Sequence, residues 1–106
     1  MQTAVIYNVS VKVDEAIAAD WLHWLKSEHI PEILATGCFF RAITSRLLEV
    51  DDTDGPTFTI QYHSFSKAEY NRYIEQHAPA MWQKGFDAWG NRFVAFRSVM
   101  QVVDEM

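Results

Sequence analysis

Apolar residues repeat with two different periods along this chain, and the order of those periods restricts the fold. From Ala4 to Val13 they alternate with a period of two, which is typical of a strand with one buried face. A helical spacing follows, then two further strand-like segments, a second helical segment and a last strand. The sequence therefore predicts the order β-α-β-β-α-β in a single domain that covers residues 1–106.

Cap and turn residues place the boundaries in the first half of the chain. Asp14 begins the first helix. Ile30-Pro31 is expected to interrupt that helix, because the residue before a proline avoids the helical region, and Gly37 is expected to end it. The second and third strands are predicted at 38–50 and 57–65, joined by an acidic turn.

The second helix carries its own break. Ser66 caps its start. Pro79 should split the helix near His77, because proline lacks the N–H of the internal hydrogen bond and clashes with the preceding turn. Gly90 ends the second piece, and residues 91–103 are the fourth strand.

This order of elements predicts a ferredoxin-like α+β plait. Right-handed crossovers convert it into a four-stranded antiparallel sheet with both helices on one face and the first and third strands at the centre. With 49% hydrophobic residues, the chain can bury one core of its own. Such a fold supports many unrelated functions and implies none by itself.

Composition excludes several classes of function. A net charge of −5 argues against binding along nucleic-acid phosphates, which needs a basic surface. The single cysteine, Cys38, excludes an intrachain disulfide and a thiolate-rich zinc site, and its apolar surroundings favour a buried, inert thiol. No glycine-rich loop, nucleophile elbow or zinc-protease histidine pair is present, so we expect neither a metal nor a cofactor.

The sequence also indicates where in the cell the protein is located. No window approaches the roughly 18 apolar residues of a membrane span. The N-terminal residues have neither the basic start nor the apolar stretch of a secretion signal. The expected location is therefore the cytoplasm.

The sheet face that the helices leave uncovered is the most informative part of the prediction. Val5, Tyr7, Val9 and the apolar side of the third strand should lie beneath the helices. Strand alternation assigns to the uncovered face a mixture of apolar and polar residues: Ile6, Asn8, Ser10, Phe39, Arg41, Ile43, Thr59, Gln61, His63, Phe93, Arg97 and Gln101.

Three roles are open to this face. Single-stranded RNA is disfavoured, because plaits that bind RNA stack bases on aromatic residues of the central strands, where this chain has amides and a histidine. The face could instead pack on a second copy, as in a dimeric α/β barrel. Such a dimer could also enclose a cavity for a small ligand.

Four residues are the candidate ligand-binding set of such a cavity. Arg97 would supply a positive charge, Asn8 and Gln61 would donate and accept amide hydrogen bonds, and His63 could exchange a proton near neutral pH. The alternative is structural: Arg97 pairs with a carboxylate and the amides bond across the dimer.

The remaining histidines and large aromatic residues have simpler interpretations. His23 lies on the polar side of the first helix and is a surface residue, whereas His29 and His77 lie near helix C-termini, where they favour capping. The aromatic residues with helical spacing are interpreted as core: Trp21, Trp24, Tyr70, Tyr73, Trp82 and Trp89.

Several segments together resemble an uncharacterised bacterial family of short stand-alone proteins, a domain of unknown function common in Bacteroidetes-type bacteria. This resemblance implies a ferredoxin-like plait and brings no activity or ligand. The segments that carry it are Ile6-Tyr7-Asn8-Val9, Trp21-Leu22, Glu28-His29-Ile30-Pro31-Glu32, Ala35-Thr36-Gly37-Cys38-Phe39, Gln61-Tyr62, His77-Ala78-Pro79 and Phe93-Val94-Ala95-Phe96-Arg97.

A wider similarity links the chain to dimeric α/β-barrel proteins, which include antibiotic-biosynthesis monooxygenases and haem-degrading enzymes. The haem-degrading pattern has an Asn on the first strand, a Trp on the second helix and a His about ten residues later. Asn8 matches, but Tyr73 and Gln83 stand at the other two positions. The resemblance therefore does not extend to haem degradation by that mechanism.

The sequence thus predicts a cytoplasmic homodimer that binds a small anionic or aromatic ligand at its sheet–sheet interface, with no nucleic-acid or membrane partner. Two alternatives stay open. One is a monooxygenase or haem-handling enzyme of the dimeric α/β-barrel type. The other is a structural or regulatory dimerisation module without a ligand.

Overall fold

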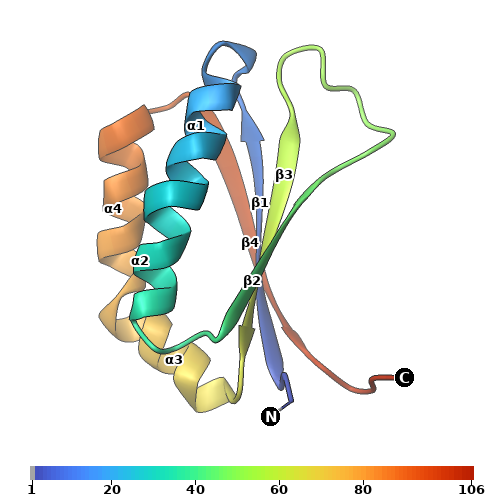
Figure 1. Cartoon of the computed structure of the whole chain (residues 1–106), viewed down its shortest axis with the longest axis vertical. Helices are drawn as coiled ribbons and strands as arrows, with labels where there is room; N and C mark the ends of the chain where they lie inside the picture. Colours follow the sequence, from blue (N-terminus) through green and yellow to red (C-terminus); the bar gives the residue numbers. More distant parts are fainter. Residues whose placement is uncertain (1) are drawn as a thin grey trace.

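The computed structural model describes residues 2–106 and shows one sheet with helices on one side only (Figure 1). The strand order is β2-β3-β1-β4, and all neighbouring strands are antiparallel. This confirms the predicted plait. The strands are β1 (Val5–Val13), β2 (Arg41–Arg46), β3 (Thr57–Ser64) and β4 (Phe93–Gln101).

The helical layer consists of two segments, each built from more than one piece. The first connects β1 to β2 and the second connects β3 to β4. The pieces in chain order are η1 (Glu15–Ile17), α1 (Ala18–Trp24), η2 (Leu25–His29), α2 (Ile30–Ala35), α3 (Lys67–Gln76) and α4 (Ala78–Trp89).

The core lies between the sheet and this layer. Alternate residues of the two central strands face the helices, as predicted, and nearly all of them are buried. Tyr73 of α3 and Leu25 of η2 are among the most deeply buried side chains of the helices. Aromatic rings fill much of the space, with Tyr7 of β1 packed against Phe39, Tyr62 and Tyr73.

Two predicted helix boundaries are confirmed. The second helical segment is broken at His77, which has φ −124° between α3 and α4, and Pro79 lies in the first turn of α4. There its missing N–H costs no hydrogen bond. The first segment ends as expected, because Gly37 adopts φ +78°, a left-handed conformation that glycine tolerates.

The predicted interruption at Ile30-Pro31 is wrong. His29 and Ile30 both have helical backbone angles, and the segment continues to Ala35. The reason is η2, a π-helical turn in which the Ile30 N–H bonds to the Leu25 carbonyl five residues earlier. The extra residue of the π turn lets the helix continue past the proline instead of ending before it.

The prediction for the second strand needs two corrections. β2 begins at Arg41 and ends at Arg46, shorter than the predicted 38–50. Arg41 and Ile43 do lie on the uncovered face, because their partners in β3 lie there. Phe39, however, is buried in the core, because the chain bends just before β2 and the strand alternation does not extend back to it.

The residues of β4 face the opposite side of the sheet from the predicted one. Arg97 pairs with Val9 and Phe93 pairs with Val13, so both point toward the helices, and Gln101 does so as well. The residues between them occupy the uncovered face. The prediction failed because β4 carries apolar side chains on both faces. The hydrophobic pattern therefore does not indicate which of its residues face the helices. The β4 residues of the uncovered face are Val94, Phe96, Ser98 and Met100.

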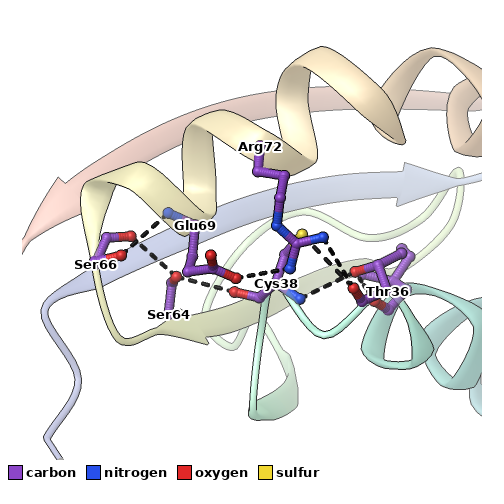
Figure 2. Close-up of polar contacts among 7 residues, drawn as sticks. Thr36, Cys38, Ser64, Ser66, Glu69 and Arg72 are labelled. Atoms are coloured by element: carbon purple, nitrogen blue, oxygen red, sulfur yellow. Dashed lines mark hydrogen bonds and ion pairs between the residues drawn. The ribbon is translucent and has the colours of Figure 1, made fainter.

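A polar cluster joins the entry of β2 to the start of α3 (Figure 2). The buried Ser64 hydroxyl lies 3.0 Å from the Cys38 carbonyl oxygen and 3.1 Å from that of Ser66. Arg72 donates to the Thr36 carbonyl at 3.3 Å. Cys38 is a free, buried thiol, as predicted. These contacts satisfy backbone groups where the chain is irregular, which is a structural role.

Candidate functional site

A cavity of about 60 Å³ lies between the sheet and the helices. By the same measure one water molecule needs about 10–15 Å³, so the cavity has room for a small ligand or a few waters. Its wall is formed by β1, β3 and β4 on one side and by α1, η2, α2, α3 and α4 on the other. Most of its lining side chains are apolar or aromatic, among them Tyr62, Trp21, Trp24, Tyr73 and Trp82.

Arg97 provides the positive charge of the cavity. It lines the cavity from β4 and is itself exposed, so it marks the mouth. Its guanidinium carbon lies 5.0 Å from the centre of the Trp82 ring, a cation–π distance. Within residues 2–106 it makes no ion pair with a carboxylate. Trp82 is 42% exposed, so its assignment to the core was wrong.

Tyr7 presents a hydroxyl to the same space. Its Oη is buried and has no hydrogen-bond partner among the described residues. Burial raises the pKa of this phenol, and the charge of Arg97 together with the nearby polar groups of Trp82 and Arg97 opposes that change. The hydroxyl is therefore protonated at neutral pH and free to donate to a ligand.

His29 is the third polar group of the cavity. Its ring stacks on Trp24, with centroids 4.5 Å apart and planes at 19°. Nδ1 is buried and has no partner in the described part of the chain. Burial lowers the pKa of this imidazole to about 4, despite an opposing effect of Glu32, while Lys84 and Arg97 lower it further. The ring is thus neutral at pH 7. The capping interpretation is wrong, because helix continues beyond His29 to Ala35.

The lowered pKa of His29 predicts a specific acid sensitivity. Between about pH 6.5 and pH 4 the unfolded chain binds a proton at this imidazole that the native protein does not, so stability falls as pH falls. This residue should account for about 2 kcal/mol of lost unfolding free energy between pH 7 and pH 5. Urea denaturation at both pH values should show a smaller loss in His29→Phe. An equal loss in both proteins would contradict the prediction.

The sequence-predicted residues divide between two places. Asn8 pairs with Gln61 across β1 and β3, and His63 lies on the same uncovered face opposite Ile6. Arg97 lies on the other side of the sheet, in the cavity. The structure therefore places Asn8, Gln61 and His63 together on the uncovered face and Arg97 apart from them. A ligand-binding role for the three stays a prediction.

His63 has local contacts on the uncovered face. Its Nδ1 lies 2.9 Å from the Thr3 hydroxyl, and its Nε2 is buried without a partner in residues 2–106. Burial lowers the pKa of His63, and the charge of Arg41 lowers it further, against a raising effect of Glu105. Asn8 donates to the Ser10 hydroxyl at 3.2 Å.

Sequence reasoning missed Tyr7 and His29 as candidate site residues. Tyr7 follows the apolar alternation of β1 and is indistinguishable by pattern from core. His29 had one usable signal: a proline two residues later, inside a segment with helical spacing on both sides. That combination is compatible with a π turn, an element frequent at functional sites.

Two other features are absent from the described residues. None of the helices there has the length and apolar character needed to cross a membrane. No group of three or more His, Cys, Asp or Glu side chains in that part of the chain is arranged to hold a metal ion.

Comparison with known proteins gives a family and a fold. The family described as "Domain of unknown function (DUF4286)" matches residues 4–103. No curated protein matches the sequence. A dimeric ferredoxin-like protein from an uncultured marine organism is similar in structure, with a TM-score of 0.68, 10% identity, and 99% of this chain and 100% of that chain covered.

Two further similar structures come from Streptomyces. One is a monooxygenase from the gene ActVA-Orf6 of Streptomyces coelicolor in complex with nanaomycin D, with a TM-score of 0.62, 14% identity, and 98% and 91% coverage of the two chains. The other is SnoaB of Streptomyces nogalater, a cofactor-independent oxygenase, with a TM-score of 0.67, 11% identity and 97% coverage of each chain. At these identities the likeness is one of fold.

Proposed function

The chain belongs to the family described as a domain of unknown function (DUF4286), and we propose that it is a homodimer that binds a small aromatic anion in the cavity between the sheet and the helices. The observation that carries this proposal is Arg97: a guanidinium without a carboxylate partner in residues 2–106, at the mouth of a cavity lined by aromatic rings.

The charge of the ligand follows from the surroundings of Arg97. A guanidinium placed beside an apolar cavity is stabilised by an anionic group with two acceptor oxygens, such as a carboxylate. Within residues 2–106 no carboxylate pairs with Arg97. The guanidinium carbon lies at a cation–π distance from the Trp82 ring, a contact that does not neutralise the charge of Arg97.

The aromatic character of the ligand follows from the lining. Ligand cavities are mainly apolar with a few polar groups that fix orientation. Here the rings of Trp24, Tyr62 and Tyr73 form the walls, and flat rings pack well against one another in offset or edge-to-face arrangements.

The homodimer is supported by the uncovered face. Phe96 of β4 is 70% exposed there, and Val94 and Met100 of the same strand are exposed beside it. Ile43 of β2 is exposed at the other edge of the same face. Exposed apolar patches of this kind mark interaction surfaces, and a face that is its own complement forms a two-fold dimer. The marine protein of similar structure is described as dimeric.

Benzoate is a suitable first probe for this site. We expect it to raise the melting temperature of the protein, whereas benzamide and cyclohexanecarboxylate, which lack the charge or the ring, should have smaller effects. In Arg97→Met the affinity for benzoate should fall about tenfold or more, since a hydrogen bond to a charged group contributes about 1.5–3 kcal/mol.

Arg46→Met is the matched control for this experiment. Arg46 is an exposed arginine that pairs with Asp52 at 2.7 Å and is not one of the residues that line the cavity. Its replacement should leave the response to benzoate unchanged. The proposed function is wrong if no aromatic anion stabilises the wild-type protein, or if Arg97→Met responds as the wild type does.

A further inference from the structure

Trp24 and His29 stack although they are five residues apart in one helical segment. In an α-helix of 3.6 residues per turn, side chains at this spacing point about 140° apart. The π turn Leu25–His29 lies between them and has more residues per turn, which brings both side chains to the same side. The geometry of this pair therefore depends on η2.

Pro31 accounts for the position of the π turn. Proline inside a regular helix removes one hydrogen bond and its ring clashes with the preceding turn. Here the five-residue hydrogen bond from the Ile30 N–H to the Leu25 carbonyl comes directly before Pro31, which lies in the first turn of α2. The irregular turn is thus located where the proline requires it.

The π turn has an energetic consequence at His29. It holds the imidazole against Trp24 with Nδ1 buried and without a partner in the described residues, which destabilises the protein relative to one in which this atom is hydrogen-bonded. A native structure rarely retains such an atom without a reason. Because His29 lines the cavity, a ligand there could supply the missing partner.

We propose that His29 is a specificity-determining residue of the cavity, and that the π turn fixed by Pro31 positions its Nδ1 to hydrogen-bond a hydroxyl group of the ligand. This inference rests on the proposed function. It narrows the ligand class to aromatic anions that also carry a hydroxyl: the anionic group binds Arg97 from β4, and the hydroxyl binds His29 from the helical layer.

The two polar groups have complementary roles. Arg97 is charged and lies at the mouth, whereas His29 is neutral at pH 7 because burial holds its pKa near 4. A neutral imidazole can accept a hydrogen bond from a hydroxyl without competing for the anionic group. Tyr7 Oη, also without a partner in residues 2–106, is a second donor in the same cavity.

Binding of benzoate and its 2-, 3- and 4-hydroxy isomers, measured by calorimetry, tests the role of His29. The wild type should bind at least one isomer about 2- to 10-fold more tightly than benzoate, the contribution of one hydrogen bond. His29→Phe keeps a flat ring against Trp24 but has no Nδ1, so it should lose this preference and still bind benzoate. His23→Phe, at an exposed position of α1, should keep the preference.

Pro31→Ala tests the positioning role separately. Restoring the N–H allows a regular helix, which would turn the imidazole away from Trp24. We expect the NMR titration of His29 to move up toward the ordinary value near 6.5, and the preference for hydroxybenzoate to fall while benzoate still binds.

The outcomes distinguish the two proposals. If none of the four probes binds the wild type, the proposed function is wrong. If the probes bind but the preference is absent in the wild type or survives in His29→Phe, only the role of His29 is wrong. If Pro31→Ala changes neither the titration nor the preference, the positioning role of the π turn is wrong.

Discussion

Replacing Phe96 by aspartate should convert the protein from a dimer to a folded monomer. Phe96 is 70% exposed in the single chain and lies on the uncovered face of β4. In a two-fold dimer through this face, the substitution would bury an unpaired carboxylate twice, and each burial costs several kcal/mol. Light scattering at micromolar concentration should therefore show about twice the chain mass for the wild type and the chain mass for Phe96→Asp.

Phe86→Asp is the matched control for this experiment. Phe86 is 59% exposed, but it belongs to α4 on the opposite side of the sheet. The same change of side chain there should leave the dimer intact. Ile6→Asp, in the middle of the uncovered face opposite Met100, should behave like Phe96→Asp. A folded Phe96→Asp protein that remains dimeric would remove this face from the interface.

The proposed dimer also bears on the three polar residues of the uncovered face. Asn8 and Gln61 face each other across the two central strands, and His63 has a buried Nε2 without a partner in residues 2–106. A second copy would bury these groups, and buried polar groups need hydrogen-bond partners. We therefore expect either cross-dimer hydrogen bonds or a ligand between the sheets at this point, as the sequence suggested.

The central strands were predictable because each has one buried and one uncovered face. In β1 and β3 apolar side chains alternate with polar ones, so the period of two also fixes the phase. β4 has Phe93 and Ala95 toward the helices but Val94 and Phe96 on the other side. A strand that is apolar on both faces is expected where both faces become covered. The failure to assign its phase therefore supports a second layer on the uncovered face.

The cavity was less predictable than the fold, for physical reasons that Arg97 and His29 illustrate. Arg97 was recognised as unusual, but its face depends on the phase of β4, which hydrophobicity does not define. His29 lines the cavity because a π turn changes the direction of its side chain. A prediction from helical periodicity assumes a regular α-helix and therefore misplaces this residue. Pro31 gave a local signal of irregularity, but the choice between a break and a π turn depends on packing against the sheet.

Gly55→Ala should cause the largest loss of stability of the substitutions considered. Gly55 has φ +146°, a conformation nearly restricted to glycine, and a Cβ atom there would lie 1.8 Å from the Val13 carbonyl oxygen and 2.9 Å from the Glu15 nitrogen. Two backbone hydrogen bonds hold the loop around Gly55 against the end of β1. The Val13 N–H donates to the Pro56 carbonyl and the Glu15 N–H donates to the Asp54 carbonyl, both at 3.0 Å. The clash can be relieved only by breaking these contacts.

The expected cost combines backbone strain with the loss of those contacts and is about 3 kcal/mol or more. For a chain of this size that corresponds to a melting temperature lower by roughly 10–25 °C. Gly90→Ala is the control: Gly90 also has positive φ, +60°, but no atom lies within 4 Å of its added Cβ. Its ψ of −131° lies outside the left-handed helical region, so the backbone strain of the alanine should cost about 1–3 kcal/mol, without the steric clash expected at Gly55. Equal melting temperatures for the two variants would show that the β2–β3 loop does not pack on the end of β1 as closely as the structure indicates.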